Sequence, residues 1–293
     1  MSSHLVEPPL PYSLARSASG LHTLTRRFAA GTLELVFRTP AGPAHARVQQ
    51  LRDARLAIEL TAPDDDSALA RLRFLLALEL DLGPFYRSVV GDPLLGPAVL
   101  RARGLRILPL DSPAHALLRG VCGQLVSSRE AASSENAALR AVAQPHAGLL
   151  LSPTQAELRT LGQAHLESFG LAGRRAGALV RALKLVDLDE LARVQTAEVV
   201  ARLVAQPGIG PWTAGVVVSE GLGRIDHGLV GDLGHVKLLT RLHGREPDAG
   251  ELAELLDRYA PYQGLASLYL QRAPQARVAA SVRELAAFGA RRR

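Results

Sequence analysis

The sequence predicts an α+β protein in which a small antiparallel sheet with a helix precedes an all-α part. Two early segments, 32–38 and 56–60, alternate or cluster β-forming residues between Gly and Pro punctuation. From Pro84 onward no convincing strand pattern remains, and helical periodicity continues with short Gly/Pro breaks. Strands followed by a long run of helices are typical of an α+β architecture.

The first elements follow from composition and periodicity. Residues 1–20 are rich in Pro and Ser, and we expect a flexible arm there. Residues 21–95 are assigned to an N-terminal α+β domain, whose helix carries leucines from Leu69 to Leu80 at helical spacing. The acidic run Asp64–Ser67 before it is interpreted as helix caps and solvated loop rather than as a metal cluster.

The second part of the chain, residues 96–272, is assigned to a helical domain, and the boundary between the two parts is expected near 85–110. The expected helices span 84–103, 112–131, 133–145, 153–169, 172–186, 187–193, 196–206, 211–222, 232–243, 248–259 and 262–271. The last residues, 273–293, are expected to form a basic helical tail that either packs on the body or binds phosphates.

The composition limits the function classes. At 293 residues the chain suggests about two domains, and its single cysteine, Cys122, excludes both a disulfide framework and a four-cysteine iron–sulfur cluster. The net charge of +6 fits a polyanionic partner. Only Lys184 and Lys237 are lysines among the 34 basic residues. A GC-rich genome explains this bias without any function, but arginine also binds phosphate well.

The chain opens without a basic-then-apolar leader and has no apolar run of the ~20 residues that span a bilayer. We therefore expect a cytoplasmic protein of bacterial type, associated with the nucleoid. We also expect a monomer with no membrane partner.

The most informative segment is the turn Gln206–Pro211, which lies between two helical stretches. Gly208 and Gly210 are expected where the turn is too tight for side chains, and Pro211 suits the first position of the next helix. The N–H groups at such a helix start form an anion site, which suits one DNA phosphate. By itself the turn also fits an ordinary helix-turn-helix corner. An isolated carboxylate, Asp232, follows about two dozen residues later.

Three ordered blocks resemble one family. The turn and the later Asp232 resemble the helix-hairpin-helix superfamily of DNA glycosylases, whose hairpin reads roughly L-P-G-[IV]-G and precedes a catalytic aspartate. Residues 123–127, GQLVS, look like a second segment of that family, and residues 261–270, PYQGLASLYL, look like its late helix. Within the superfamily the sequence is most similar to the AlkA-type 3-methyladenine DNA glycosylase II group. That group places a small α+β domain before the helical part.

The resemblance implies that Asp232 is the catalytic residue. Breaking a C1′–N bond builds positive charge on the sugar, and a carboxylate beneath it stabilises that charge. An alkylated purine is already cationic and leaves without protonation, so one carboxylate suffices. Locally, Asp232 also fits an N-cap of the following helix, which is compatible with catalysis.

The resemblance also assigns the DNA contacts. Leu125 matches the position of a wedge that enters the minor groove, although by hydrophobicity alone it reads as core. Its neighbour Gln124 either faces the bases or packs on the hairpin, and Ser127 belongs to the same segment. The anchor for the backbone is the hairpin with Gly208, Gly210 and Thr213.

A monovalent cation is the only cofactor that the resemblance suggests. In relatives the backbone carbonyls of such a turn hold Na⁺ or K⁺, which would place the ion here on Val204, Gln206 and Ile209. No His/Cys/Asp spacing suggests a zinc or iron site on side chains.

The base pocket is the least defined part of the resemblance. Trp212 and Tyr262 match aromatic pocket positions, whereas Val216 stands where relatives often have tyrosine. Trp212 also reads as a hinge-packing residue. The chain departs from the family at three further positions, which are Gly228, Leu229 and Gln263.

Trp212 also occupies the slot in which bifunctional relatives carry a Schiff-base lysine. Lys184 and Lys237 are the only lysines in the chain. Lys237 falls on an expected packing or phosphate-facing surface. An amine nucleophile is therefore not expected. The sequence predicts a monofunctional enzyme that uses water and leaves an abasic site.

The first hypothesis is thus a monofunctional DNA glycosylase of base excision repair that flips alkylated, 3-methyladenine-like bases out of duplex DNA. Other damaged bases, deaminated or oxidised, are a neighbouring hypothesis. A non-catalytic protein that binds damaged DNA is a third, since the departures from the family pattern leave turnover open. A helical scaffold for other proteins is the most distant one, and it predicts binding without the salt dependence of phosphate contacts.

Overall fold

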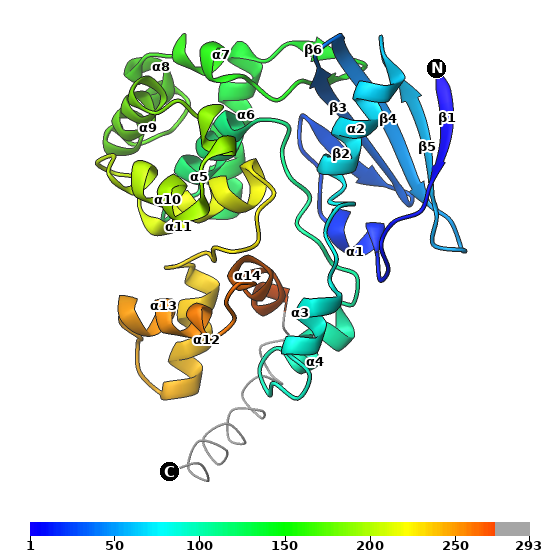
Figure 1. Ribbon diagram of the computed structural model, residues 1–293. Coiled ribbons are helices and arrows are strands. Elements are labelled where there is room, and N and C mark those ends of the chain that lie inside the picture. The colour runs from blue at the N-terminus through cyan, green and yellow to red at the C-terminus, as the bar shows by residue number, and fades with distance from the viewer. Residues whose placement is uncertain (273–293) are drawn as a thin grey trace.

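The computed structural model describes residues 1–272, apart from the side chains at positions 242, 243, 249 and 272, and shows a sheet beside two groups of helices (Figure 1). The strands are β1 (Ser2–Val6), β2 (Arg26–Ala29), β3 (Thr32–Thr39), β4 (Gly42–Gln50), β5 (Leu56–Thr61), β6 (Pro145–His146) and β7 (Leu149–Leu150). The first helices are α1 (Leu14–Ala18), α2 (Asp65–Leu75), α3 (Gly83–Ser88), α4 (Gly96–Arg101), α5 (Pro113–Cys122), α6 (Ser128–Val142), α7 (Gln155–Arg159), α8 (Gln163–Ser168) and α9 (Gly173–Leu185). The remaining ones are η1 (Glu190–Arg193), α10 (Thr196–Val204), α11 (Pro211–Val216), η2 (Val217–Gly221), α12 (Leu233–His243), α13 (Ala249–Asp257) and α14 (Gln263–Arg272). The tail expected at 273–293 lies outside the described residues.

The sheet is antiparallel with the strand order β1-β5-β4-β3-β2, so the α+β class is confirmed. Alternate residues of β5, from Leu56 to Leu60, are buried, and α2 covers that face (Figure 1). The Asp64 side chain accepts a hydrogen bond from the Ser67 N–H at 3.0 Å and so caps α2. The capping interpretation of the acidic run is therefore confirmed at Asp64.

The first twenty residues are not the flexible arm that their composition suggested. Ser2–Val6 form the edge strand β1, which pairs with β5 along its whole length, and Ser13 caps the short helix α1. Backbone hydrogen bonds hold an edge strand whatever its side chains are, and Leu5 is in fact exposed. A Pro- and Ser-rich composition therefore gave no sign of this pairing.

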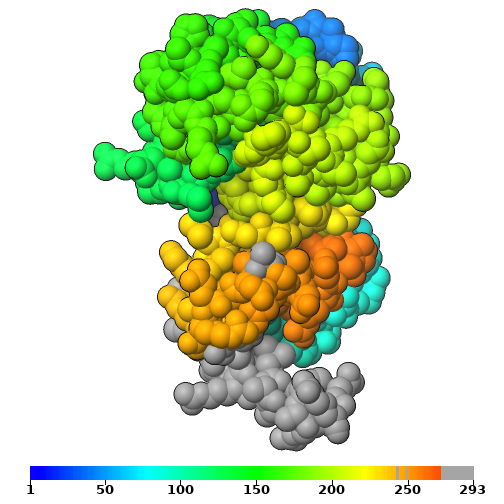
Figure 2. Space-filling model, turned by 90° about the vertical axis from the view of Figure 1, so that its left-hand side faces the viewer, coloured from blue at the N-terminus to red at the C-terminus, as the bar shows by residue number. Residues whose placement is uncertain are grey.

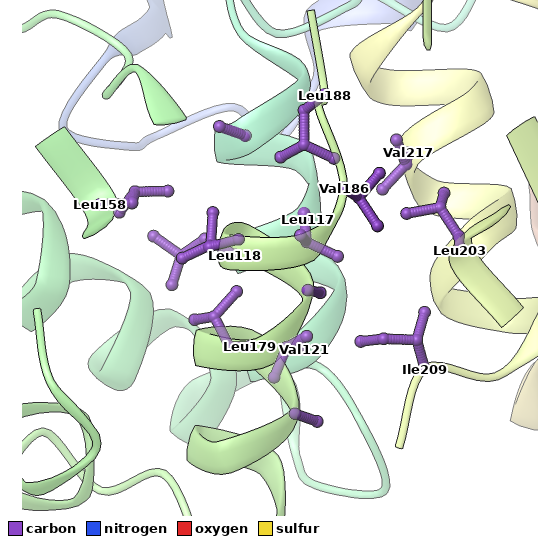
Figure 3. Packing of buried hydrophobic residues seen from close by; sticks show 14 of the residues in the cluster. Leu117, Leu118, Val121, Leu158, Leu179, Val186, Leu188, Leu203, Ile209 and Val217 are labelled. Atoms are coloured by element: carbon purple, nitrogen blue, oxygen red, sulfur yellow. The ribbon is translucent and has the colours of Figure 1, made fainter. Parts of the chain in front are cut away.

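The helices form two groups, each with its own core. Buried residues of α5 to α11 and η2 pack together in the first group, as Figure 3 shows for Leu117, Leu179 and Leu203. The second group combines α3 and α4 with α12, α13 and α14 around Phe85 and Tyr269. Figure 1 shows this second group below the first one.

The boundary between the two parts lies earlier than residue 95. Leu82, Phe85 and Leu95 are buried against the C-terminal helices, so α3 and α4 belong to the second helical group. The chain then returns to the sheet, because Leu108 packs into the sheet core. Hydrophobic periodicity locates a helix but does not say which core it joins, which explains the misplaced boundary.

Several details of the expected elements were wrong. The stretch 153–169 forms two helices, α7 and α8, rather than one. The stretch 84–103 forms two helices rather than one, and the stretch 112–131 is interrupted by a loop at 123–127. Strands β6 and β7 form a two-residue hairpin around Gly148, in a region where no strand was expected. Hydrophobic patterning cannot detect strands of two residues.

Two absences hold for the described part of the chain. No helix within residues 1–272 is long and apolar enough to cross a bilayer. No group of three or more His, Cys, Asp or Glu side chains in that range is arranged to hold a metal ion.

Candidate active site

A cleft of about 670 Å³ lies where the two helical groups meet. Figure 2 shows the molecule hollowed between the green-to-yellow helices above and the orange helices below. Three segments line the cleft, namely the loop after α5, the turn between α10 and α11, and the residues just before α12. The lining residues are Gly123, Gln124, Leu125, Val126, Ser128, Gly208, Ile209, Gly210, Pro211, Trp212, Thr213, Val230, Gly231, Asp232 and Leu233. The structure thus brings together the loop of the GQLVS segment, the hairpin turn and Asp232, whereas residues 261–270 of the third block do not line the cleft.

The turn between α10 and α11 is closely packed at one glycine and open at the other. Gly208 has φ +90°, and a Cβ there would lie 2.7 Å from the Ala178 Cβ. Gly210 has φ −95°, and no atom lies within 4 Å of a Cβ built on it. The expectation that the turn excludes a side chain is therefore correct for Gly208 and wrong for Gly210.

The start of α11 is exposed to the cleft. Gly210 precedes the helix with an extended backbone, and Pro211 takes the first helical position, where a missing N–H costs nothing. The N–H groups of this first turn have no acceptors inside the helix. Because α11 continues directly into η2, they lie at the positive end of an extended helical segment.

Asp232 is held by four N–H donors. Its Oδ1 accepts hydrogen bonds from the N–H groups of Gly234 at 2.8 Å and His235 at 3.4 Å, which makes it the N-cap of α12. Its Oδ2 accepts hydrogen bonds from Trp212 Nε1 and Gln271 Nε2, each at 3.1 Å. The carboxylate is partly exposed and lines the cleft, so the cap and a site role occur in the same residue.

The loop after α5 presents Leu125 to solvent. The Leu125 side chain is 87% exposed and its φ is +54°, in the left-handed region that β-carbon-bearing residues seldom adopt. An apolar residue held in this way is not core, so the core interpretation of Leu125 is wrong. Ser127 instead caps α6, where it forms a capping box with Glu130, and it does not line the cleft.

Gln124 packs on the hairpin rather than facing away from it. Its Nε2 donates to the Gly208 carbonyl oxygen at 3.0 Å and contacts Thr213 Oγ1 at 2.9 Å. Arg175 holds the other side of the loop by donating to the Cys122 carbonyl oxygen at 3.2 Å. The exposed loop and the hairpin are therefore one connected structure.

Trp212 lies between these parts. Its indole rests against Gly123, where a Cβ would lie 2.8 Å from the ring, and its N–H donates to Asp232. The structure does not bring Tyr262 or Val216 to the cleft. Tyr262 packs on Phe85 with ring centroids 5.7 Å apart, and Val216 is 3% exposed in the core.

Two of the three departures from the family pattern, Gly228 and Leu229, have clear packing or hydrogen-bond partners. A Cβ at Gly228 would lie 2.7 Å from Leu256, so this position allows close packing of the segment before Asp232. The Leu229 N–H donates to Ser267 Oγ at 2.9 Å. The buried Oε1 of Gln263 has no hydrogen-bond partner in the structure.

Charged groups cluster beside the first helical core. Arg119 contacts Glu135 Oε1 at 2.9 Å and Glu220 Oε2 at 2.9 Å, and His115 Nε2 lies 2.9 Å from the same Glu135 oxygen. Burial lowers the pKa of the His115 imidazole. Burial alone would raise the pKa of the Glu135 carboxyl, but Arg119 and the hydrogen bond from His115 bring it down to about 2.

Two functional candidates were missed in the sequence. Gln271 touches the Asp232 carboxylate from the end of α14, and Arg175 supports the exposed loop. Gln271 directly follows the late family block, which was the available signal.

Neither Lys184 nor Lys237 lines the cleft, and both are exposed on their helices.

No family model matches the sequence. The chain is 31% identical over 211 residues to a probable bifunctional transcriptional activator/DNA repair enzyme AlkA of Mycobacterium tuberculosis, an alignment covering 70% of this chain and 42% of that protein. It is 25% identical over 207 residues to a DNA-3-methyladenine glycosylase of Bacillus subtilis, covering 67% of this chain and 68% of the other. Its fold matches the 3-methyladenine DNA-glycosylase from Archaeoglobus fulgidus with a TM-score of 0.78 at 20% identity, over 92% of this chain and 97% of that one.

The sequence relatives and the fold agree with the resemblance to the helix-hairpin-helix superfamily of DNA glycosylases. Within this superfamily its relatives carry the AlkA and 3-methyladenine glycosylase names, in agreement with the three sequence blocks. The chain spans less than half the length of the AlkA relative from Mycobacterium tuberculosis. The turn between α10 and α11 and Asp232 are the positions where the sequence resembles the hairpin and the aspartate of that superfamily.

Proposed function

We propose that this chain is a DNA glycosylase that hydrolyses the N-glycosidic bond of alkylated bases in double-stranded DNA. The observation that carries the proposal is the cleft, in which the exposed Leu125, the start of α11 and the Asp232 carboxylate converge. The names of its relatives support DNA repair of alkylated bases. The cleft is lined by residues of one chain, so we propose that the protein acts as a monomer.

Base extrusion uses the loop after α5 and the hairpin, which are joined by the hydrogen bonds of Gln124. A damaged nucleotide must leave the stack before its bond is broken, at a cost of a few kcal/mol. Leu125 fills the gap from the minor groove, and the N–H groups at the start of α11 bind the displaced phosphate. Gln124 keeps wedge and anchor at a constant separation, because it bonds to Gly208 and Thr213 of the hairpin.

Asp232 stabilises the sugar as the bond breaks. The C1′–N bond breaks with its electron pair going to the base, and positive charge develops at C1′. The carboxylate is already oriented by four N–H groups, so its charge acts without reorganisation. Water then adds to C1′, and its proton is lost to the medium, which leaves an abasic site.

We further propose that the enzyme is monofunctional. A strand-cleaving enzyme of this superfamily needs an amine nucleophile, and Trp212 occupies the slot for it. Lys184 and Lys237 are both exposed and lie outside the cleft lining, so neither is placed to attack C1′.

A monovalent cation at the hairpin is also proposed. The carbonyl groups of Val204, Gln206 and Ile209 lie at the end of α10 and in the turn. Carbonyl oxygens at the negative end of a helix suit Na⁺ or K⁺, and such an ion would bridge the turn to a phosphate. The expected result is tighter DNA binding in KCl or NaCl than in a tetramethylammonium salt at equal ionic strength.

The test is chromatographic identification of the bases freed from methylated duplex DNA. Wild type releases methylated purines, and Asp232→Asn releases them at least ~100-fold more slowly because the charge beneath C1′ is lost. Asp226→Asn is the matched control, since Asp226 accepts a hydrogen bond from Thr196 outside the cleft. If wild type releases no nucleobase, the proposal is overturned. If wild type cleaves the DNA strand without alkali treatment, the proposal that the enzyme is monofunctional is overturned.

A further inference from the structure

Helix α9 packs against both segments that base extrusion uses, the loop after α5 and the hairpin. Leu179 of α9 belongs to the same core as Val121, near the end of α5, and Ile209 of the hairpin (Figure 3). A Cβ on Gly208 of the hairpin would lie only 2.7 Å from the Cβ of Ala178. No residue of α9 lines the cleft, so any part that this helix plays in extrusion is indirect.

Two arginines of α9 bond to backbone carbonyl groups in these segments. Arg175 Nη1 donates to the carbonyl oxygens of Cys122 at 3.2 Å and Gln124 at 3.5 Å, at the start of the exposed loop. Arg181 Nη2 donates to the carbonyl oxygen of Pro207, in the hairpin, at 3.0 Å. Cys122 is the last residue of α5 and Pro207 follows the end of α10, so each guanidinium lies at the negative end of a helix.

Arg175, Ala178 and Arg181 form one row on α9. Residues three apart are neighbours on a helix surface, so Ala178 lies between the two arginines. A helix rises 1.5 Å per residue, which separates the arginine backbones by about 9 Å along the axis. All three residues lie within the 13-residue span of α9, so a regular helix sets the spacing of the row.

Gln124 completes a closed set of links. Its Nε2 donates to the Gly208 carbonyl oxygen at 3.0 Å, directly after the Pro207 carbonyl that Arg181 holds. Arg175 therefore joins α9 to the loop, Gln124 joins the loop to the hairpin, and Arg181 joins the hairpin to α9. Three elements linked pairwise in this triangle cannot shift relative to one another without breaking a hydrogen bond.

The triangle also acts on the conformation of Leu125. This residue has φ +54° and its side chain is exposed, so its own packing does little to hold that backbone. A strained backbone persists where the surrounding structure fixes it. The preceding residue, Gln124, is held at its carbonyl by Arg175 and at its side-chain amide by the hairpin. These bonds fix the direction in which Leu125 projects.

We propose that Arg175 and Arg181 are positioning residues for base extrusion, which hold the Leu125 loop and the hairpin at the separation that an extruded nucleotide requires. The proposal rests on the proposed glycosylase function. Because wedge and anchor are placed before DNA binds, less of the binding free energy is spent on ordering them. Neither arginine lines the cleft, so both act through the carbonyl groups that they hold.

The test compares single-turnover release of 7-methylguanine from two duplexes, one with the lesion opposite cytosine and one with it mispaired with adenine. A mispaired base costs less to extrude, so a defect in extrusion has a smaller effect there. In Arg175→Gln and in Arg181→Gln we expect release from the paired duplex to fall ~10-fold and release from the mispaired duplex to fall less than ~3-fold. A loss of folded enzyme alone would lower release from both duplexes equally.

Arg159→Gln is the matched control. Arg159 Nε also donates to a backbone carbonyl oxygen at the end of a helix, that of Leu183 in α9, at 2.6 Å. It contacts neither the loop nor the hairpin through this bond and does not line the cleft. We expect the ratio of its two release rates to stay that of wild type.

A double variant tests whether the links form one triangle. Once Gln124→Ala has opened the triangle, Arg175→Gln removes less, so we expect the double variant to be at most ~3-fold slower than the slower single variant on the paired duplex. Affinity for DNA is also measured against salt concentration in Arg181→Gln, whose exposed side chain can change without altering the core. The slope should stay that of wild type, because Arg181 holds a carbonyl group rather than a phosphate.

Three results each overturn the proposal. They are equal effects on the two duplexes in both arginine variants, fully multiplicative effects in the double variant, and a salt slope reduced by about one in Arg181→Gln, which would mark a direct phosphate contact. If wild type releases 7-methylguanine from neither duplex, the proposed function itself is overturned.

Discussion

At the residue scale, the orientation of the Asp232 carboxylate depends on its hydrogen-bond donors. Trp212 and Gln271 both donate to Oδ2, the oxygen that the α12 cap does not use. A hydrogen bond to a charged group contributes about 1.5–3 kcal/mol, and 1.4 kcal/mol is tenfold in rate. The orientation of the carboxylate is therefore set by residues on two other helices together with the start of α12.

Trp212→Phe tests this dependence, because it keeps an aromatic ring against Gly123 and removes only the N–H donor. We expect the single-turnover rate of base release to fall ~10-fold, with DNA affinity within ~2-fold of wild type. The measurement is base release at saturating enzyme together with a binding titration. An unchanged rate would show that the Trp212 hydrogen bond does not orient Asp232.

The two hairpin glycines provide a matched pair. Gly208→Ala combines a positive φ with a Cβ 2.7 Å from Ala178, so we expect a loss of about 1–3 kcal/mol in the free energy of unfolding. Gly210→Ala meets no atom within 4 Å and adopts an allowed φ, so its stability should change by less than ~1 kcal/mol. Its methyl group instead covers exposed backbone in the cleft, and DNA binding should weaken. Denaturant unfolding and a binding titration check both, and equal stabilities would contradict the packing argument.

The sequence predicted residues that lie in motifs better than residues that meet through packing. Gly208, Trp212 and Asp232 were found because each belongs to a short motif with a local geometry. Tyr262 matched an aromatic position but packs on Phe85, because a motif does not say which way a ring points. Gln271 was missed because its contact with Asp232 joins α14 to the start of α12 across 39 positions.

At the element scale, the loop at 123–127 and the hairpin form one DNA-contacting unit. The loop interrupts what the periodicity indicated as a single helix, and Trp212 occupies the space beside Gly123. Apolar periodicity continues through the break, since Leu125 is apolar but exposed. The sequence pattern of this segment alone therefore does not reveal the interruption of the helix, which depends on the packing of Trp212 against Gly123.

Gln124→Ala removes the hydrogen bonds between the loop and the hairpin and leaves Leu125 unchanged. Losing the bonds to Gly208 and Thr213 frees the loop, so we expect base extrusion to become ~5–10-fold less favourable, which corresponds to about 1–1.4 kcal/mol. Fluorescence of 2-aminopurine beside the lesion reports extrusion. Gln163→Ala is the control, because Gln163 bonds to Glu167 on an exposed surface away from the cleft. Equal extrusion in both variants would contradict a coupling role for Gln124.

At the scale of the whole molecule, the sheet part does more than precede the helices. Residue Arg26 of β2 reaches the carbonyl groups of Leu108 and Pro109, in the segment that links the second helical group to α5. Arg38 of β3 contacts Glu157 at 2.8 Å in the first helical group. The sheet part therefore contacts both the linking segment and the first helical group, an arrangement that no local sequence pattern encodes.

The same central region makes stability fall in acid. The folded-state pKa of His115 is lowered by burial, so below its usual value of 6.5 the unfolded chain binds a proton that the folded chain does not. The pKa of Glu135 lies at about 2 in the folded state against 4.5 ordinarily, so its contribution is present above pH 4.5 and is lost as pH falls towards 2. Both signs agree. The free energy of unfolding, measured in denaturant at pH 7, 5.5, 4 and 3, should fall at each step. In Glu135→Gln the value at pH 7 is lower because Arg119 and His115 lose their partner, and the decline below pH 4.5 is shallower because that carboxyl no longer titrates. Parallel declines in the two proteins would show that the acid sensitivity arises elsewhere.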